Sequence, residues 1–144
     1  MAKKPKRPPW QIVFFQRHPK DEPASPVPGR DFLDACPEKV RATMLQVLSA
    51  VRDAPPPAYS GGGYWEAMHG EMGGYYEVRV NGPDREHFRL FCLLENDEKL
   101  GAPSLVVLTG AAKPFRTAFS KEEYAAVRRL GEEYRKRTPR SVAP

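Results

Sequence analysis

The first half of the chain alternates between one strand-like segment and two helical ones. Trp10–Phe15 is aromatic and β-branched, which predicts a strand. The segment 29–35 reads as a short helix. From Pro37 to about Asp53, apolar residues recur at the spacing of one helix face. They are Val40, Met44, Val47, Leu48 and Val51. The proline run 55–57 ends this helix.

The second half changes to an alternation with a period of two residues, which is typical of half-buried strands. We expect strands over Tyr64–His69, Tyr75–Val80, His87–Glu95 and Leu105–Thr109. Gly73-Gly74 and Asn81-Gly82-Pro83 mark turns between them. Ser120 and Glu123 have the spacing of a capping box, which predicts a helix that runs to about Arg137. Its inward face comprises Tyr124, Val127, Leu130 and Tyr134.

This order of elements indicates an α+β fold. We expect the N-terminal strand and the helical pair to pack on an antiparallel sheet, with a helix at the C-terminus. One face of the sheet would cover the helical pair, and the other would stay at least partly open.

Composition divides the chain into one domain and two tails. Residues 1–9 are basic and rich in proline, which predicts a disordered tail. The domain spans 10–137, and 138–144 form a flexible tail. Six Lys and Arg and no acid fall within residues 1–20, so the basic ends suit nucleic acid or an acidic protein. The alternative is that this charge serves solubility. No signal peptide and no membrane-spanning apolar stretch is evident, so we expect a cytoplasmic protein with no membrane partner.

Basic side chains cluster on one predicted sheet face. Arg79 and Arg89 both oppose the apolar face of their strands, and Lys113 and Arg116 follow the last strand. Arginine binds phosphate through two parallel hydrogen bonds and offsets the charge of a phosphoryl transition state. The alternative is an ordinary solvated face on which Glu77 pairs with the arginines.

Candidate proton carriers lie near these cations. Cleavage of RNA by its own 2′-hydroxyl requires a base, an acid and charge neutralisation, with no metal. His69, Glu77 and His87 are the candidates for the proton transfers, although each histidine can also be read as a surface residue. No metal motif and no cofactor motif is evident, so we expect neither.

Aromatic residues near the cations suit the stacking of RNA bases. The candidates for RNA binding are Tyr75, Phe115 and Phe119, together with the cation of Arg116. Core packing is the better interpretation for Tyr76 and Phe91.

The order of these motifs resembles the RelE/ParE toxin superfamily, and is most similar to its HigB-like, phage-derived branch. The matching segments cover about residues 10–137. They are Tyr64–Gly70, Tyr76–Arg79, Phe88–Phe91, Leu105–Gly110 leading to Lys113, and Ser120–Tyr134.

The resemblance implies a RelE-like fold and the toxin of a type II toxin–antitoxin pair, an endoribonuclease that cuts mRNA on the ribosome through a 2′,3′-cyclic phosphate. Its partner would be a cognate antitoxin with a helix-turn-helix. Arg89 matches the family's strand arginine, Arg79 a position that is often basic, and Lys113 the basic residue after the last strand. Phe119 lies near a position where a tyrosine is common, so His69, His87 or Glu77 would have to replace its proton chemistry.

Two other functions remain open. One is a non-enzymatic poison of DNA gyrase or another protein, as in the ParE branch, acting through the C-terminal helix. The other is a domesticated RNA-binding regulator that keeps the fold without cleavage.

Overall fold

The structure is a computed structural model that describes residues 10–54 and 63–144. The predicted tail at 1–9 and the proline run at 55–57 lie outside these ranges. The described helices are α1 (Pro28–Ala35), α2 (Glu38–Asp53), α3 (Asp97–Leu100) and α4 (Lys121–Lys136). The strands are β1 (Gln11–Phe14), β2 (Trp65–Ala67), β3 (Tyr76–Gly82), β4 (Glu86–Glu95) and β5 (Ser104–Pro114).

Both long helices form where the sequence predicts them. Helix α2 begins one residue after Pro37, which occupies the N-cap position, and the five predicted apolar positions of α2 are all buried. In the predicted capping box of α4, the Glu123 N–H donates to Ser120 Oγ at 3.1 Å. The Ser120 N–H donates to Glu123 Oε1 at 3.0 Å. No helix within the described ranges has both the length and the apolar character to cross a bilayer.

The five strands form one sheet in the order β1-β5-β4-β3-β2, which confirms the α+β class. We expected an antiparallel sheet, but one of its pairings is parallel. Strand β1 joins the edge of the sheet parallel to β5. Strand β5 is also longer than predicted and contains Lys113, which was expected to follow the strand. Its second half begins at Gly110, where a side chain would collide with the Phe32 ring of α1. The small residues in the second half of β5 permit this close approach of α1. They also hide the alternation of apolar and polar residues from which a strand is predicted.

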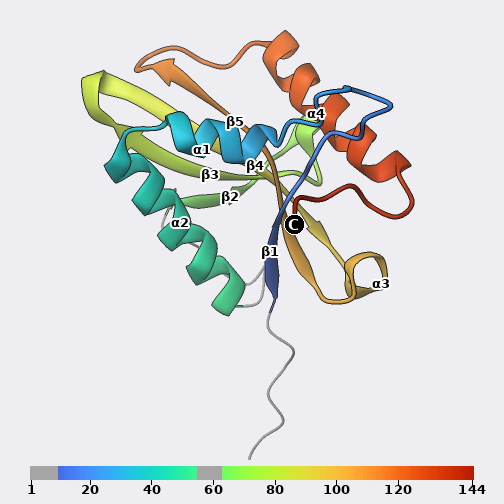
Figure 1. Cartoon of the computed structure of the whole chain (residues 1–144). Helices are drawn as coiled ribbons and strands as arrows, with labels where there is room; N and C mark the ends of the chain where they lie inside the picture. The colour runs from blue at the N-terminus through green and yellow to red at the C-terminus, as the bar shows by residue number, and fades with distance from the viewer. Residues whose placement is uncertain (1–9, 55–62) are drawn as a thin grey trace, which may run out of the picture.

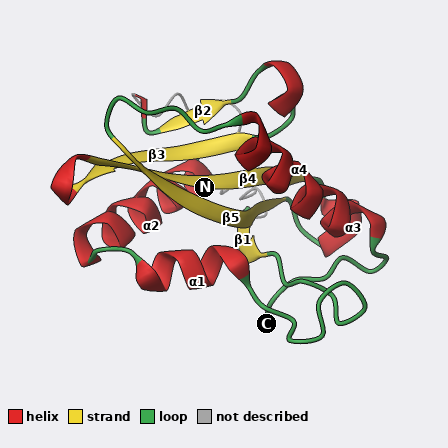
Figure 2. Cartoon of the chain, turned by 90° about the horizontal axis from the view of Figure 1, so that it is seen from above, coloured by secondary structure: helices red, strands yellow, loops and turns green. Residues whose placement is uncertain are grey.

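The sheet separates two hydrophobic cores, as Figures 1 and 2 show by the placement of α1 and α2 on one face and of α4 on the other. The first core includes Met44, Leu48, Val51, Val78 and Leu90. The second core includes Phe15, Phe91, Leu93, Leu108 and Tyr134. Cys92 lies in the first core, and burial raises the pKa of its thiol.

Helix α4 covers only part of its face of the sheet. Its buried residues Val127 and Tyr134 pack with Phe91 and Leu93 of β4, towards the C-terminal end of that strand. Residues of β3 and β4 that lie further along the same face, on the side of the turn that joins these strands, are polar. This part of the sheet, left open by α4, is where the candidate site lies.

The segment after α4 is packed, although its composition predicts a flexible tail. The Gln16 N–H donates to the Ser141 carbonyl at 3.1 Å, and the Ala143 N–H donates to the Phe14 carbonyl at 2.8 Å. Arg140 Nε donates to Glu95 Oε1 at 2.8 Å. Backbone pairing along the edge of β1 and this ion pair therefore hold residues 140–143 against the sheet.

A network around Asp21 joins the loop after β1 to the end of α4. Asp21 pairs with Lys136 and Arg137, in each case at 2.8 Å, and these cations lower its pKa from 3.8 to about 2.

A carboxylate with a lowered pKa adds stability above its unfolded pKa and loses it as the pH falls through the folded value. We expect Asp21→Asn to lower the melting temperature at pH 7, and the deficit relative to wild type to shrink as the pH falls from about 4 towards 2. Thermal unfolding at several pH values checks this, and a deficit that stays constant over this pH range would contradict it.

Candidate functional site

The polar part of the sheet face on which α4 packs, which we call the open face, consists of six side chains on three adjacent strands. The strand register places Arg79 opposite Arg89, Asn81 opposite His87, and His87 opposite Lys113. Directly opposed residues of antiparallel strands lie on the same side of the sheet. Glu77 completes the open face because it lies two residues before Arg79 on β3. The register of the three strands therefore brings five of the six candidate catalytic residues onto one face.

Two arginines form the centre of the open face. The Arg79 side chain is 44% exposed, whereas Arg89 as a whole is only 8% exposed. Among the described residues, the one hydrogen bond of the Arg89 side chain goes from Nη1 to the Phe88 carbonyl at 3.1 Å. Burial, and then the charge of Arg79, lower the pKa of Arg89. Like charges directly opposed across strands are unfavourable, so an anion bound between them would relieve a cost built into the sheet.

His87 lies next to this pair and is oriented by two contacts. Its Nδ1 lies 2.9 Å from Asn81 Oδ1, and its ring packs on Phe115 with 4.6 Å between centroids. Because an amide oxygen only accepts, Nδ1 carries the proton and Nε2 is free to take another. Desolvation and then the charges of Arg89 and Arg79 lower the pKa of His87. Both effects favour the neutral ring, which is the form that a general base requires.

Glu77 lies on the other side of the arginine pair from His87. Its Oε1 is 3.6 Å from Arg79 Nε, and its side chain is only 14% exposed. Burial raises the pKa of Glu77 and the neighbouring Glu66 adds to this, although Arg89 and Arg79 oppose it. Glu77 is thus a sheltered carboxylate that binds protons more readily than an exposed one.

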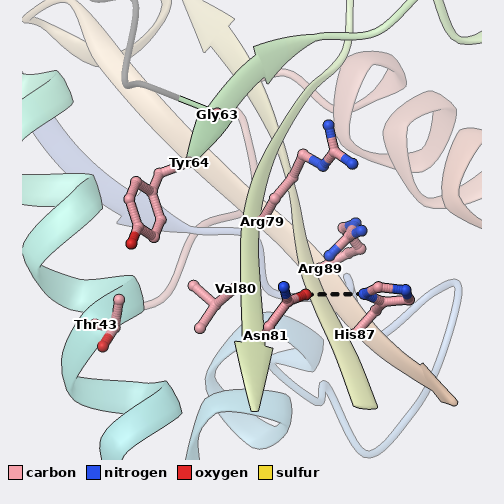
Figure 3. Close-up of a pocket in the computed structure, with 8 residues that line it drawn as sticks. All are labelled: Thr43, Gly63, Tyr64, Arg79, Val80, Asn81, His87 and Arg89. Carbon is pink, nitrogen blue, oxygen red and sulfur yellow. Dashed lines mark hydrogen bonds between the residues drawn. The ribbon is translucent and has the colours of Figure 1, made fainter. Parts of the chain in front are cut away.

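A pocket of about 550 Å³ borders the arginines where β3 extends beyond its pairing with β2. Figure 3 shows Arg79, Arg89, His87 and Asn81 on one side of β3. Thr43, Tyr64 and Val80 line the same pocket from the side of α2. Space is therefore available for a ligand beside the arginines and the free edge of β3.

A second pocket of about 440 Å³ lies between β2, the turn that follows it, β3 and α4. His69 and Glu77 line this pocket, and Arg79 borders both pockets. The structure therefore does not bring His69 and His87 together. It places His69 in the second pocket, whereas His87 lines the first.

Lys113 is already engaged with α4. It forms an ion pair with Glu123 and lies 5.8 Å from the centre of the Phe119 ring. This ion pair lowers the pKa of Glu123. Lys113 thereby ties β5 to the capping box of α4, and it must leave Glu123 to reach a phosphate. Arg116 is exposed beyond the end of β5 and lines neither pocket.

The aromatic candidates have different surroundings. The prediction that Tyr75 stacks on RNA is wrong, because Tyr75 is 4% exposed and lies in the second core under α4, against Gly131. Tyr75 lies on the expected face of the sheet, but α4 covers the part of this face that contains Tyr75. Phe115 packs on His87, and Phe119 lies among Phe91 and Tyr124.

Sequence reasoning missed three residues near the arginines. Asn81 reads as part of an Asn-Gly turn, but β3 continues through it to Gly82. Tyr124 reads as a core residue of α4, yet it also lines the second pocket. Glu66 lies opposite Glu77 and lines the same pocket. The period-two alternation of 64–69 could have identified Glu66, whereas only the packing of α4 places Tyr124.

Comparison with known proteins gives one structural similarity. A chain of the toxin–antitoxin complex RelBE2 from Mycobacterium tuberculosis aligns with 73% of this chain and 99% of its own length. The alignment has a TM-score of 0.46 and 13% sequence identity. No family model matches the sequence. The search of curated proteins also finds no match.

Proposed function

We propose that the protein is a toxin of a type II toxin–antitoxin system that cleaves RNA without a metal ion. The observation that carries the proposal is the opposed pair Arg79 and Arg89, with His87 beside it, on a sheet face that α4 leaves open. The resemblance of the strand motifs to the RelE/ParE superfamily points the same way. This reaction requires no metal ion. It requires a cationic surface that a single RNA strand can reach.

In the proposed reaction, the arginine pair binds the non-bridging oxygens of one phosphodiester. Nε2 of His87 removes the proton of the neighbouring 2′-hydroxyl, and the 2′-oxygen attacks phosphorus. A 2′,3′-cyclic phosphate forms as the bond from phosphorus to the 5′-oxygen breaks. His69, on the far side of Arg79, returns a proton to the leaving oxygen. Arg79 and Arg89 offset the charge that develops on the phosphoryl oxygens.

The finer assignments follow the same resemblance. We place the protein in the HigB-like branch, with mRNA on the ribosome as its substrate and a helix-turn-helix antitoxin as its neutralising partner. An antitoxin would silence this site most directly by covering the open face or by offering a carboxylate to Arg79 and Arg89.

The test is cleavage of a defined mRNA on programmed ribosomes, in parallel with the same mRNA alone. Primer extension maps the ends. The proposal expects a ribosome-dependent cut within the codon in the A site. No cut in either reaction would contradict the nuclease proposal and leave the gyrase poison, tested by DNA supercoiling, as the next candidate.

A further inference from the structure

The side chain of Asn81 contacts the proposed base from the neighbouring strand. The register of the sheet places Asn81 directly opposite His87, and its Oδ1 lies 2.9 Å from His87 Nδ1. Figure 3 shows this bond between β3 and β4. Among the described residues, it is the one hydrogen bond that either side chain makes. The proposed reaction uses His87 but gives Asn81 no task.

The backbone on both sides of Asn81 is fixed by strand pairing, although the residue itself is exposed. Val80, which precedes it, is buried and pairs with Phe88. Gly82, which follows it, pairs with Glu86. A polar group on a paired strand is held more precisely than one on a loop. The amide of Asn81 can therefore fix the histidine that lies opposite it.

The contact selects one tautomer of the imidazole ring. A neutral imidazole carries a single N–H, and only its other nitrogen can take a proton. The oxygen of Asn81 accepts but cannot donate, so it favours the tautomer with the proton on Nδ1. Phe115 packs on the ring of His87 with 4.6 Å between centroids, which limits the rotation of the ring. Nε2 is then the nitrogen that accepts.

An amide also differs in charge from the carboxylate that partners the histidine of a Ser-His-Asp triad. The charged groups that face His87 are Arg79 on β3, Arg89 on its own strand and Lys113 opposite it on β5. Lys113 is paired with Glu123 of α4. A carboxylate beside the ring would offset these cations and favour its protonated form. An amide orients the ring and leaves the neutral form favoured.

We infer that Asn81 is a positioning residue of the cleavage reaction, which holds neutral His87 with the proton on Nδ1 so that Nε2 accepts the proton of the 2′-hydroxyl. The inference rests on the proposed function, in which His87 is the base. It assigns Asn81 a role in the rate of the chemical step and none in binding the RNA.

Nitrogen-15 NMR of the histidine rings in the full chain tests the contact without any cleavage. The variant His87→Gln identifies the signals of this ring among the three histidines. Above its pKa, wild-type His87 should carry the proton on Nδ1, and Asn81→Leu should lose this preference. Asn81→Asp should keep the proton on Nδ1 and raise the pKa of His87, because a carboxylate stabilises the protonated ring.

Rates of RNA cleavage show whether the contact matters for the reaction. Asn81→Leu should lower kcat by about 10- to 100-fold, a usual loss when a group that orients a functional histidine is removed, and should leave KM nearly unchanged. Asn81→Asp should restore most of this rate at high pH, with the acid limb of the profile moved to higher pH. Asn96→Asp, an exposed change just beyond the other end of β4, is the matched control and should match wild type in both experiments.

The outcomes separate this inference from the proposed nuclease activity. A wild-type ring with the proton on Nε2, or a tautomer that is unchanged in Asn81→Leu, would overturn the inference. Cleavage by Asn81→Leu at the wild-type rate would also overturn it and leave the nuclease proposal standing. An Nδ1 proton that depends on Asn81, in a protein that cuts no RNA, would support the assignment of Asn81 as the group that holds the ring and overturn only the nuclease.

Discussion

Arg89→Ala is expected to abolish growth arrest and to lower the single-turnover rate of RNA cleavage by about 10²- to 10³-fold, the usual loss when one preorganised group that stabilises transition-state charge is removed. Arg89 lies at the centre of the open face, opposite Arg79, and is held in place by burial and by its bond to the Phe88 carbonyl. Its guanidinium is therefore fixed before the substrate arrives. Arg89→Lys keeps the charge but loses the paired hydrogen bonds, so it should fall between wild type and Arg89→Ala.

The substitution Arg89→Ala should leave the protein folded. Burial and the charge of Arg79 both disfavour the charged Arg89, so its removal relieves a cost and should not lower the melting temperature through electrostatics. Arg89→Gln, closer to arginine in volume, separates loss of charge from loss of packing. Arg129→Ala, on the exposed side of α4, is the matched control and should cleave at the wild-type rate. Wild-type cleavage by folded Arg89→Ala would rule out the arginine pair as the phosphate site.

His87→Ala is expected to slow cleavage by about 10²- to 10⁴-fold, the range for loss of a general base. For wild type, kcat/KM should rise with pH as His87 loses its proton and should level off above that pKa. Because desolvation and the charges of Arg89 and Arg79 lower this pKa, the midpoint of the rise should lie below the ordinary histidine value of 6.5. His87→Ala should lack this rise, and Arg79→Ala should move it to higher pH.

The pH profile also distinguishes a catalytic role of His87 from a structural one. A histidine that only supports Phe115 or Asn81 would affect the rate without removing the acid limb of the profile. An acid limb that remains unchanged in His87→Ala would contradict the assignment of His87 as the base. His69→Ala, in the second pocket, should instead slow cleavage and keep the acid limb, because this limb belongs to His87.

The elements with strong local signals could be predicted from the sequence. The face of α2 and the capping box of α4 rest on residue spacing within a single helix, and both are confirmed. Alternation likewise places Arg79 and Arg89 on one face, because side-chain direction in a strand has a period of two. These predictions succeed because each depends on residues close together in the chain.

The errors arise where distant segments decide the outcome. The parallel pairing of β1 with β5 joins residues more than 90 positions apart, and no local pattern encodes it. Tyr75 has the alternation of an exposed residue, but α4 covers it. Residues 140–143 look like a tail until their backbone bonds to β1 are known. Lys113 looks free until Glu123 of α4 lies beside it.

The most direct test of the central claim is the chemistry of the RNA ends produced in the presence of EDTA. A defined RNA is incubated with the protein, on ribosomes that tolerate the chelator and free in solution, and both fragments are analysed by mass spectrometry. The account predicts cleavage that persists in EDTA, with a 2′,3′-cyclic phosphate on the upstream fragment and a 5′-hydroxyl on the downstream fragment. Intact RNA in both reactions, or fragments that carry a 3′-hydroxyl and a 5′-phosphate, would contradict it.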